Sequence, residues 1–92
     1  MSQENAETIA LTCLAWLVGD EDLLPVFQNA SGASAEDLRQ RMGEPGFLAS
    51  VLEFLTMDDA WVIRCCDANG LAYEQPMMAL AMLQGESRTH WT

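Results

Sequence analysis

The segment from Ala6 to Val18 limits most strongly how this chain can fold, because it would be apolar on nearly every side of a helix. Its apolar residues recur at intervals of three and four, the spacing of successive helical turns. Only Thr8, Thr12 and Ala15 form a narrow line of small or polar side chains. Because such a helix must be buried, we predict that residues 4–18 form the central helix of the domain, or that part of this helix is an oligomer surface.

The rest of the chain repeats the helical spacing and shows no sustained alternation of apolar and polar residues. Glycine, proline and capping residues divide it into further segments. We expect helices over about residues 22–29, 34–42, 45–56, 58–69 and 76–83. The fold class is therefore all-α, a compact single-domain bundle of about five to six short helices.

The predicted helix ends have specific chemical signals. Ser34 followed by Asp37 resembles a capping box, and the acidic runs 20–22 and 58–59 place carboxylates at helix starts. Gly19 and Gly70 are expected to close helices in the left-handed conformation. Two sets of inward side chains follow from the spacing: Leu38 and Met42 in the third helix, and Phe47, Leu48, Val51, Leu52, Phe54 and Leu55 in the fourth.

A chain of 92 residues can form one core, and half of its residues are apolar. Residues 1–84 are predicted to be a single helical domain. Residues 85–92 lack periodicity and are predicted to be a flexible C-terminal tail.

Charge and cysteine content limit the possible partners and the location. The net charge is −10, with four arginines and no lysine, so nucleic acid and anionic membranes should repel the chain. No apolar run approaches the ~20 residues that span a bilayer, and acidic residues precede the first apolar segment where a signal peptide is basic. Three cysteines, two of them adjacent, are typical of a reducing compartment. We therefore expect a cytoplasmic protein.

The candidate reactive residues are Cys65 and Cys66, whose thiols could serve a redox or regulatory role. They fall late in their predicted helix, where the helix dipole disfavours a thiolate, and small buried hydrophobes are the simpler interpretation. The sequence has no paired C-x-x-C spacing, EF-hand loop or phosphate-binding loop. We expect no cofactor, no metal and no catalytic residue, and an enzyme is the less favoured class.

A methionine-rich end supplies the candidate interaction surface. Met77, Met78 and Met82, together with Trp91 in the predicted tail, could present an adaptable apolar surface to a partner. The alternative is that this segment is a helix that covers the core.

Several segments in order carry a family resemblance. The run ETIALTCLAWLVGDEDLLPVFQNASGAS, then FLASVLEFLTMDDAWVIRCCDANGL and the tyrosine and proline of AYEQP, resemble the DUF3572 family of uncharacterised small bacterial proteins. The resemblance covers about residues 7–76. It implies a compact helical domain in a bacterial cytoplasm and supplies no activity or site residue.

The leading functional hypothesis is a non-enzymatic helical domain that acts through protein contact, either with a separate partner or as a homodimer. One alternative is a thiol-based redox or regulatory protein that uses Cys65 or Cys66. A further alternative is an acidic mimic of nucleic acid, formed by the carboxylates of residues 20–22 and 58–59.

Overall fold

The computed structural model describes the backbone of residues 1–88 and the side chains of residues 1–85. Within this part of the chain all regular structure is helical, as predicted, and there is no strand. The six helices are α1 (Gln3–Val18), α2 (Leu23–Ser31), α3 (Ala35–Arg41), α4 (Pro45–Leu55), α5 (Asp59–Asn69) and α6 (Gln75–Arg88).

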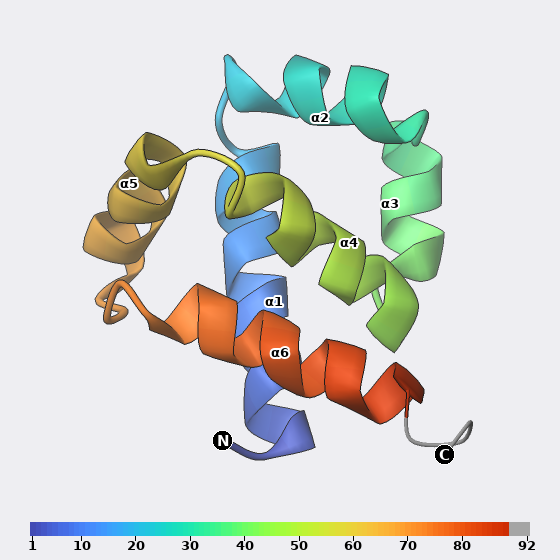
Figure 1. Ribbon diagram of the computed structural model, residues 1–92. Helices are drawn as coiled ribbons and strands as arrows, with labels where there is room; N and C mark the ends of the chain where they lie inside the picture. The colour runs from blue at the N-terminus through green and yellow to red at the C-terminus, as the bar shows by residue number, and fades with distance from the viewer. Residues whose placement is uncertain (89–92) are drawn as a thin grey trace.

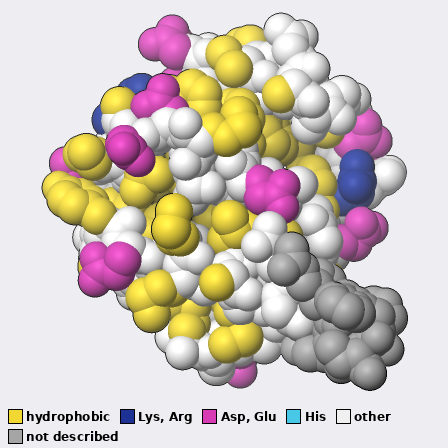
Figure 2. Space-filling view, viewed as in Figure 1, with side chains coloured by type: hydrophobic (Ala, Val, Ile, Leu, Met, Phe, Trp, Pro, Cys, Tyr) yellow, Lys and Arg dark blue, Asp and Glu magenta, His cyan; other side chains and the backbone are white. Residues whose placement is uncertain are grey.

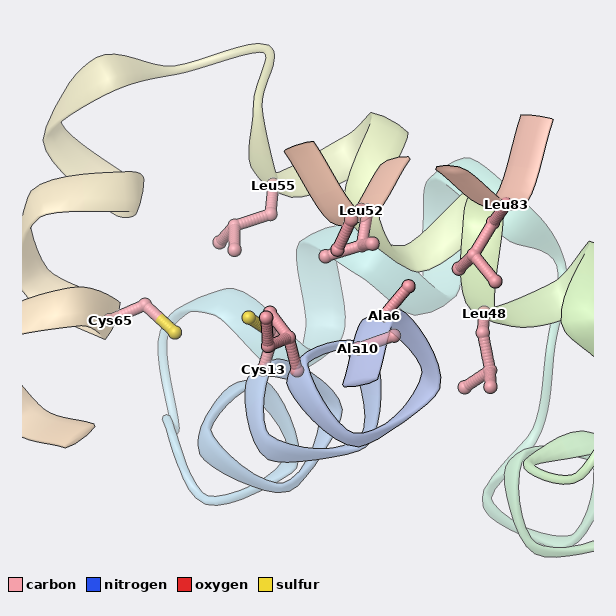
Figure 3. Close-up of a cluster of buried hydrophobic side chains, with 10 residues drawn as sticks. Ala6, Ala10, Cys13, Leu48, Leu52, Leu55, Cys65 and Leu83 are labelled. Atoms are coloured by element: carbon pink, nitrogen blue, oxygen red, sulfur yellow. The ribbon is translucent and has the colours of Figure 1, made fainter. Parts of the chain in front are cut away.

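Helix α1 is central, and α4 and α6 cross it on one side (Figure 1). Three small side chains on this face of α1, Ala6, Ala10 and Cys13, are fully buried. They leave room for larger side chains from α4 and α6, so that the layers interdigitate (Figure 3). The large side chains that α4 and α6 contribute to this cluster are Leu48, Leu52, Leu55 and Leu83.

A second cluster joins the C-terminal half of α1 to α2, α3 and α4. Phe27 lies at its centre and makes edge-to-face contacts with Phe47 and Phe54. Phe54 in turn stacks on Trp61, with ring centroids 4.9 Å apart. The six inward residues predicted for α4 are all buried, which confirms the pattern in that helix.

Capping explains most helix boundaries. The predicted capping box forms between Ser34 and Asp37. The Asp58 carboxylate accepts a hydrogen bond from the Ala60 amide at the start of α5, and Gly70 ends that helix with φ of 67°, in the left-handed region that favours glycine.

Two details of the predicted helix ends were wrong, the conformation of Gly19 and the end of α6, whereas the predicted cap of α2 was right. Gly19 ends α1 with φ of −80°, so it is right-handed; its amide donates to the Ala15 carbonyl, and the chain turns without a left-handed residue. At α2 the acidic run supplies the cap, as predicted: the Asp20 carboxylate accepts from the Asp22 and Leu23 amides, while Asp22 itself makes no side-chain cap. Helix α6 continues past the expected end near residue 83, since Gly85 is tolerated within it and the helix reaches Arg88.

Candidate functional site

An apolar groove with a volume of about 600 Å³ lies between α1 and α3. Each wall is one face of a helix. Helix α1 supplies Leu11, Leu14, Ala15 and Val18, and α3 supplies Ala35, Leu38, Arg39 and its capping residue Met42. Both sets have the spacing i, i+3, i+4 and i+7, which is the stripe that a helix presents to another helix. Leu24 of α2 completes the lining.

The groove has a buried floor and an exposed rim. Leu14 and Leu38 form the floor and are almost inaccessible to solvent. Leu11, Val18 and Met42 stand at the rim with 39%, 44% and 48% of their surfaces exposed. The rim therefore exposes apolar surface to water, and a molecule bound in the groove would cover this surface.

The two walls are held apart by α2 and by the caps at its ends. Asp20 holds the first amides of α2, and Gly32 ends the helix with φ of 73°. The Ser34 capping box then starts α3 two residues later. A long buried side chain on α2, Phe27, fixes this helix against α4. The groove is thus a consequence of the α1–α2–α3 corner.

Arg39 is the charged group of the groove. Among the described side chains it makes no ion pair or hydrogen bond, whereas Arg41 pairs with Glu44 at 3.6 Å and Arg64 pairs with Asp20. The Arg64 guanidinium also lies over the Trp16 ring. No described carboxylate lines the groove, so it presents one unpartnered cation on a surface that is otherwise strongly acidic. Figure 2 shows on one face how acidic side chains outnumber basic ones.

The sequence predictions missed this groove. Helix α1 was predicted to be buried as the central helix or to be in part an oligomer surface; it is central, but Leu11 and Val18 are exposed. Met42 was predicted to point inward with Leu38, but it lies at the rim. The sequence feature that could have indicated the groove is the stripe at residues 35, 38, 39 and 42, which has the spacing of one helix face.

The sequence did not predict that two of the buried thiols, Cys13 and Cys65, lie together. Cys65 lies opposite Cys13 of α1, and the two sulfur atoms point toward one another (Figure 3). A hydrogen bond from the Cys13 thiol lowers the pKa of Cys65, and the Asn69 amide, 3.8 Å from the Cys65 sulfur, adds to this effect. The same hydrogen bond and burial raise the pKa of Cys13. Cys65 is therefore the thiol of the pair that ionises first.

Cys66 is separate from this pair. Its thiol donates to the Ala72 carbonyl oxygen at 3.5 Å, and burial raises its pKa. All three cysteines are buried, but the pKa of Cys66 is raised and that of Cys65 is lowered, so Cys66 is the less reactive thiol of these two. The two predicted candidate thiols, Cys65 and Cys66, therefore have different surroundings.

The predicted methionine surface divides into two parts. Met77 and Met78 of α6 are exposed, by 61% and 48%, whereas Met82 is partly buried against the core. Trp91 lies outside the described residues. Among the described members of this predicted surface, Met77 and Met78 are therefore the exposed ones.

The acidic runs have structural roles at two positions. The Asp20 carboxylate accepts from the Leu23 amide, which is the main reason that its pKa lies below the usual value, and it also pairs with Arg64. Asp58 caps α5. Within the part of the chain that the structure describes, no three acidic, cysteine or histidine side chains are grouped so that they could hold a metal ion, and none of the helices there has the length and apolar character needed to cross a membrane.

Comparison with known proteins gives one match. We found no significant similarity to a curated protein or to a solved structure. A family model described as a protein of unknown function, DUF3572, matches residues 3–86, which is most of the chain. The protein therefore belongs to the DUF3572 family.

Proposed function

We propose that this protein is a non-enzymatic binding domain that acts through protein contact at the groove between α1 and α3. The observation that carries the proposal is the pair of stripes on facing helices, each with helix-packing spacing, which line an apolar groove with an exposed rim. Amphipathic helices of partner proteins bind in grooves of this kind.

The dimensions of the groove favour a short helix as the occupant. Each wall spans seven residue steps, which is about 10 Å or two helical turns. Each wall contains one small side chain, Ala15 in α1 and Ala35 in α3. At these positions the backbone of a bound helix could approach closely.

An open rim favours a macromolecule over a small molecule. Leu14 and Leu38 are the only two buried side chains among the nine that line the groove, and six of the nine are exposed. A small ligand would leave much of this rim in water, whereas small-molecule sites usually bury most of their ligand. A helix laid across the rim would cover it.

Affinity capture with matched variants tests this proposal. The wild-type chain and a Leu11→Glu, Met42→Glu variant would be used as baits in the same cell extract, with Met57→Glu as control. Met57 is 73% exposed and lies outside the groove. We expect proteins that the wild type and the control retain and the groove variant loses. Identical retention by all three baits would contradict the proposal.

A second candidate function uses the Cys13 and Cys65 thiols as a redox pair. The supporting observation is that their sulfur atoms face one another from two helices. In this scheme the Cys65 thiolate attacks a peroxide, forming a sulfenic acid and releasing water or an alcohol. The Cys13 thiol then displaces water to form a disulfide. Two thiols are oxidised and one peroxide is reduced.

Mass spectrometry after treatment with hydrogen peroxide and alkylation tests this candidate. The folded wild type and Cys66→Ser should each lose two hydrogens, and Cys13→Ser and Cys65→Ser should not form the intramolecular bridge. If the treated wild type, once unfolded, still carries three alkylatable thiols, the redox function is excluded.

We propose a bacterial cytoplasm as the location for both candidate functions. The chain has three cysteines, two of them adjacent, and these thiols would stay reduced there in the absence of an oxidant. Nucleic-acid mimicry by the acidic runs stays a prediction. Two carboxylates of these runs, Asp20 and Asp58, serve as helix caps.

A further inference from the structure

The exposed face of α6 has the same spacing as the groove walls. Glu74, immediately before the helix, and Met77, Met78 and Ala81 within it occupy positions i, i+3, i+4 and i+7. All four are exposed. The chain therefore carries, on a separate helix, an exposed two-turn stripe with a carboxylate at one end and three apolar side chains, of the length that the groove can receive.

The charges of the two surfaces are also complementary. Arg39 is the unpartnered cation of the groove, and the Glu74 carboxylate at one end of the α6 stripe makes no ion pair with a described side chain. Both side chains are exposed and long enough to adjust their positions at a contact. Such a pair would set the direction of the helix in the groove more than it would add affinity.

We infer that the occupant of the α1/α3 groove is a second copy of this chain, which inserts the Met77–Met78 face of α6 with Glu74 against Arg39. This inference rests on the proposed function, because it names the partner of the same groove. Methionine suits this role, since its flexible side chain fills irregular apolar surfaces.

The contact joins two different surfaces and is therefore heterologous. Each bound pair leaves one free groove and one free α6 face, so the association continues beyond a dimer unless a ring closes. The groove is only two turns long, and each chain has a net charge of −10. We therefore expect weak association, visible above roughly 100 µM at an ionic strength where charge repulsion is screened.

Light scattering after size exclusion, over a dilution series in reducing buffer, provides the test. The mass of the wild type should rise with concentration above the 10.2 kDa monomer. Leu11→Glu, which blocks the groove, and Met78→Glu, which blocks the α6 face, should each stay monomeric. An equal mixture of these two variants should form a 1:1 dimer and nothing larger, because it contains one usable groove and one usable face. Met57→Glu serves as the matched control and should associate like the wild type.

A charge reversal provides the second measurement. Arg39→Glu and Glu74→Arg should each weaken association by roughly tenfold, because each places like charges together. The double variant should recover it, since the pair is restored with its signs exchanged. Circular dichroism of each variant checks that its helices are intact.

Two results would overturn the inference: a wild type that stays monomeric to about 1 mM, or oligomers that neither variant disrupts. Either result leaves the proposed function to be decided by the capture experiment, where a separate partner would still be lost with Leu11→Glu, Met42→Glu. If the groove variants kept both the captured proteins and the oligomers, the inference of self-association and the proposed function would both be rejected.

Discussion

Replacing Phe27 by alanine should remove a large part of the stability of this domain. The Phe27 side chain is 1% exposed and contacts two aromatic rings, with centroids 5.1 Å from Phe54 and 6.4 Å from Phe47. Truncation of a buried phenylalanine costs about 3–5 kcal/mol. The total for 92 residues is roughly 5–14 kcal/mol, so the variant should lose between about a fifth and all of it.

Urea unfolding followed by circular dichroism measures this loss. The midpoint should fall while the dependence on urea stays the same, and the melting temperature should drop by at least about 12 °C. Val26→Ala is the matched control, because its side chain is adjacent in α2 but 45% exposed; it should change stability by less than about 0.5 kcal/mol. A cost below about 1 kcal/mol for Phe27→Ala, or an equal cost for both variants, would refute the assigned role of Phe27 in the core.

Two further predictions concern the caps. Replacing Asp58 and Asp59 together by alanine should lower the free energy of unfolding by about 1 kcal/mol, because Asp58 caps α5 and Asp59 lies in its first turn; an unchanged urea midpoint would show that the cap is dispensable. The Asp20 carboxyl has a pKa in the folded chain below its unfolded value, chiefly because the Leu23 amide donates to it. Its contribution is therefore present above the unfolded pKa and is lost as the pH falls through the folded pKa. Melting temperatures measured from pH 7 to pH 2.5 should fall less steeply for Asp20→Asn than for the wild type, and parallel curves would contradict this assignment.

Local patterns were sufficient to predict the helices. The Ser34 and Asp37 pair and the asparagine–glycine end of α5 act over one turn, so their effect can be read from neighbouring residues. The stripe of α4 was also predicted correctly, because all its inward residues face one core.

The groove could not be predicted in the same way, because it depends on where α1 lies relative to α3. Leu11 and Val18 satisfy the pattern of a buried helix, yet α2 holds α3 far enough away to leave them at a rim. The contact between Cys13 and Cys65 could not be predicted for the same reason. The two residues are far apart in the sequence and meet only through the packing of α5 on α1. Met42 continues the spacing of Leu38 but lies at the end of a short helix, beyond the neighbours that bury Leu38.

Site-specific photo-crosslinking tests the central claim, that the α1/α3 groove is a protein-binding surface. A photoreactive amino acid would replace Met42 at the groove rim in one variant and Met57 outside the groove in another; both positions are exposed methionines. After irradiation in cells, position 42 should give discrete protein adducts that Leu11→Glu abolishes, and position 57 should give none of them. The absence of adducts at position 42, or the same adducts at both positions, would contradict the account.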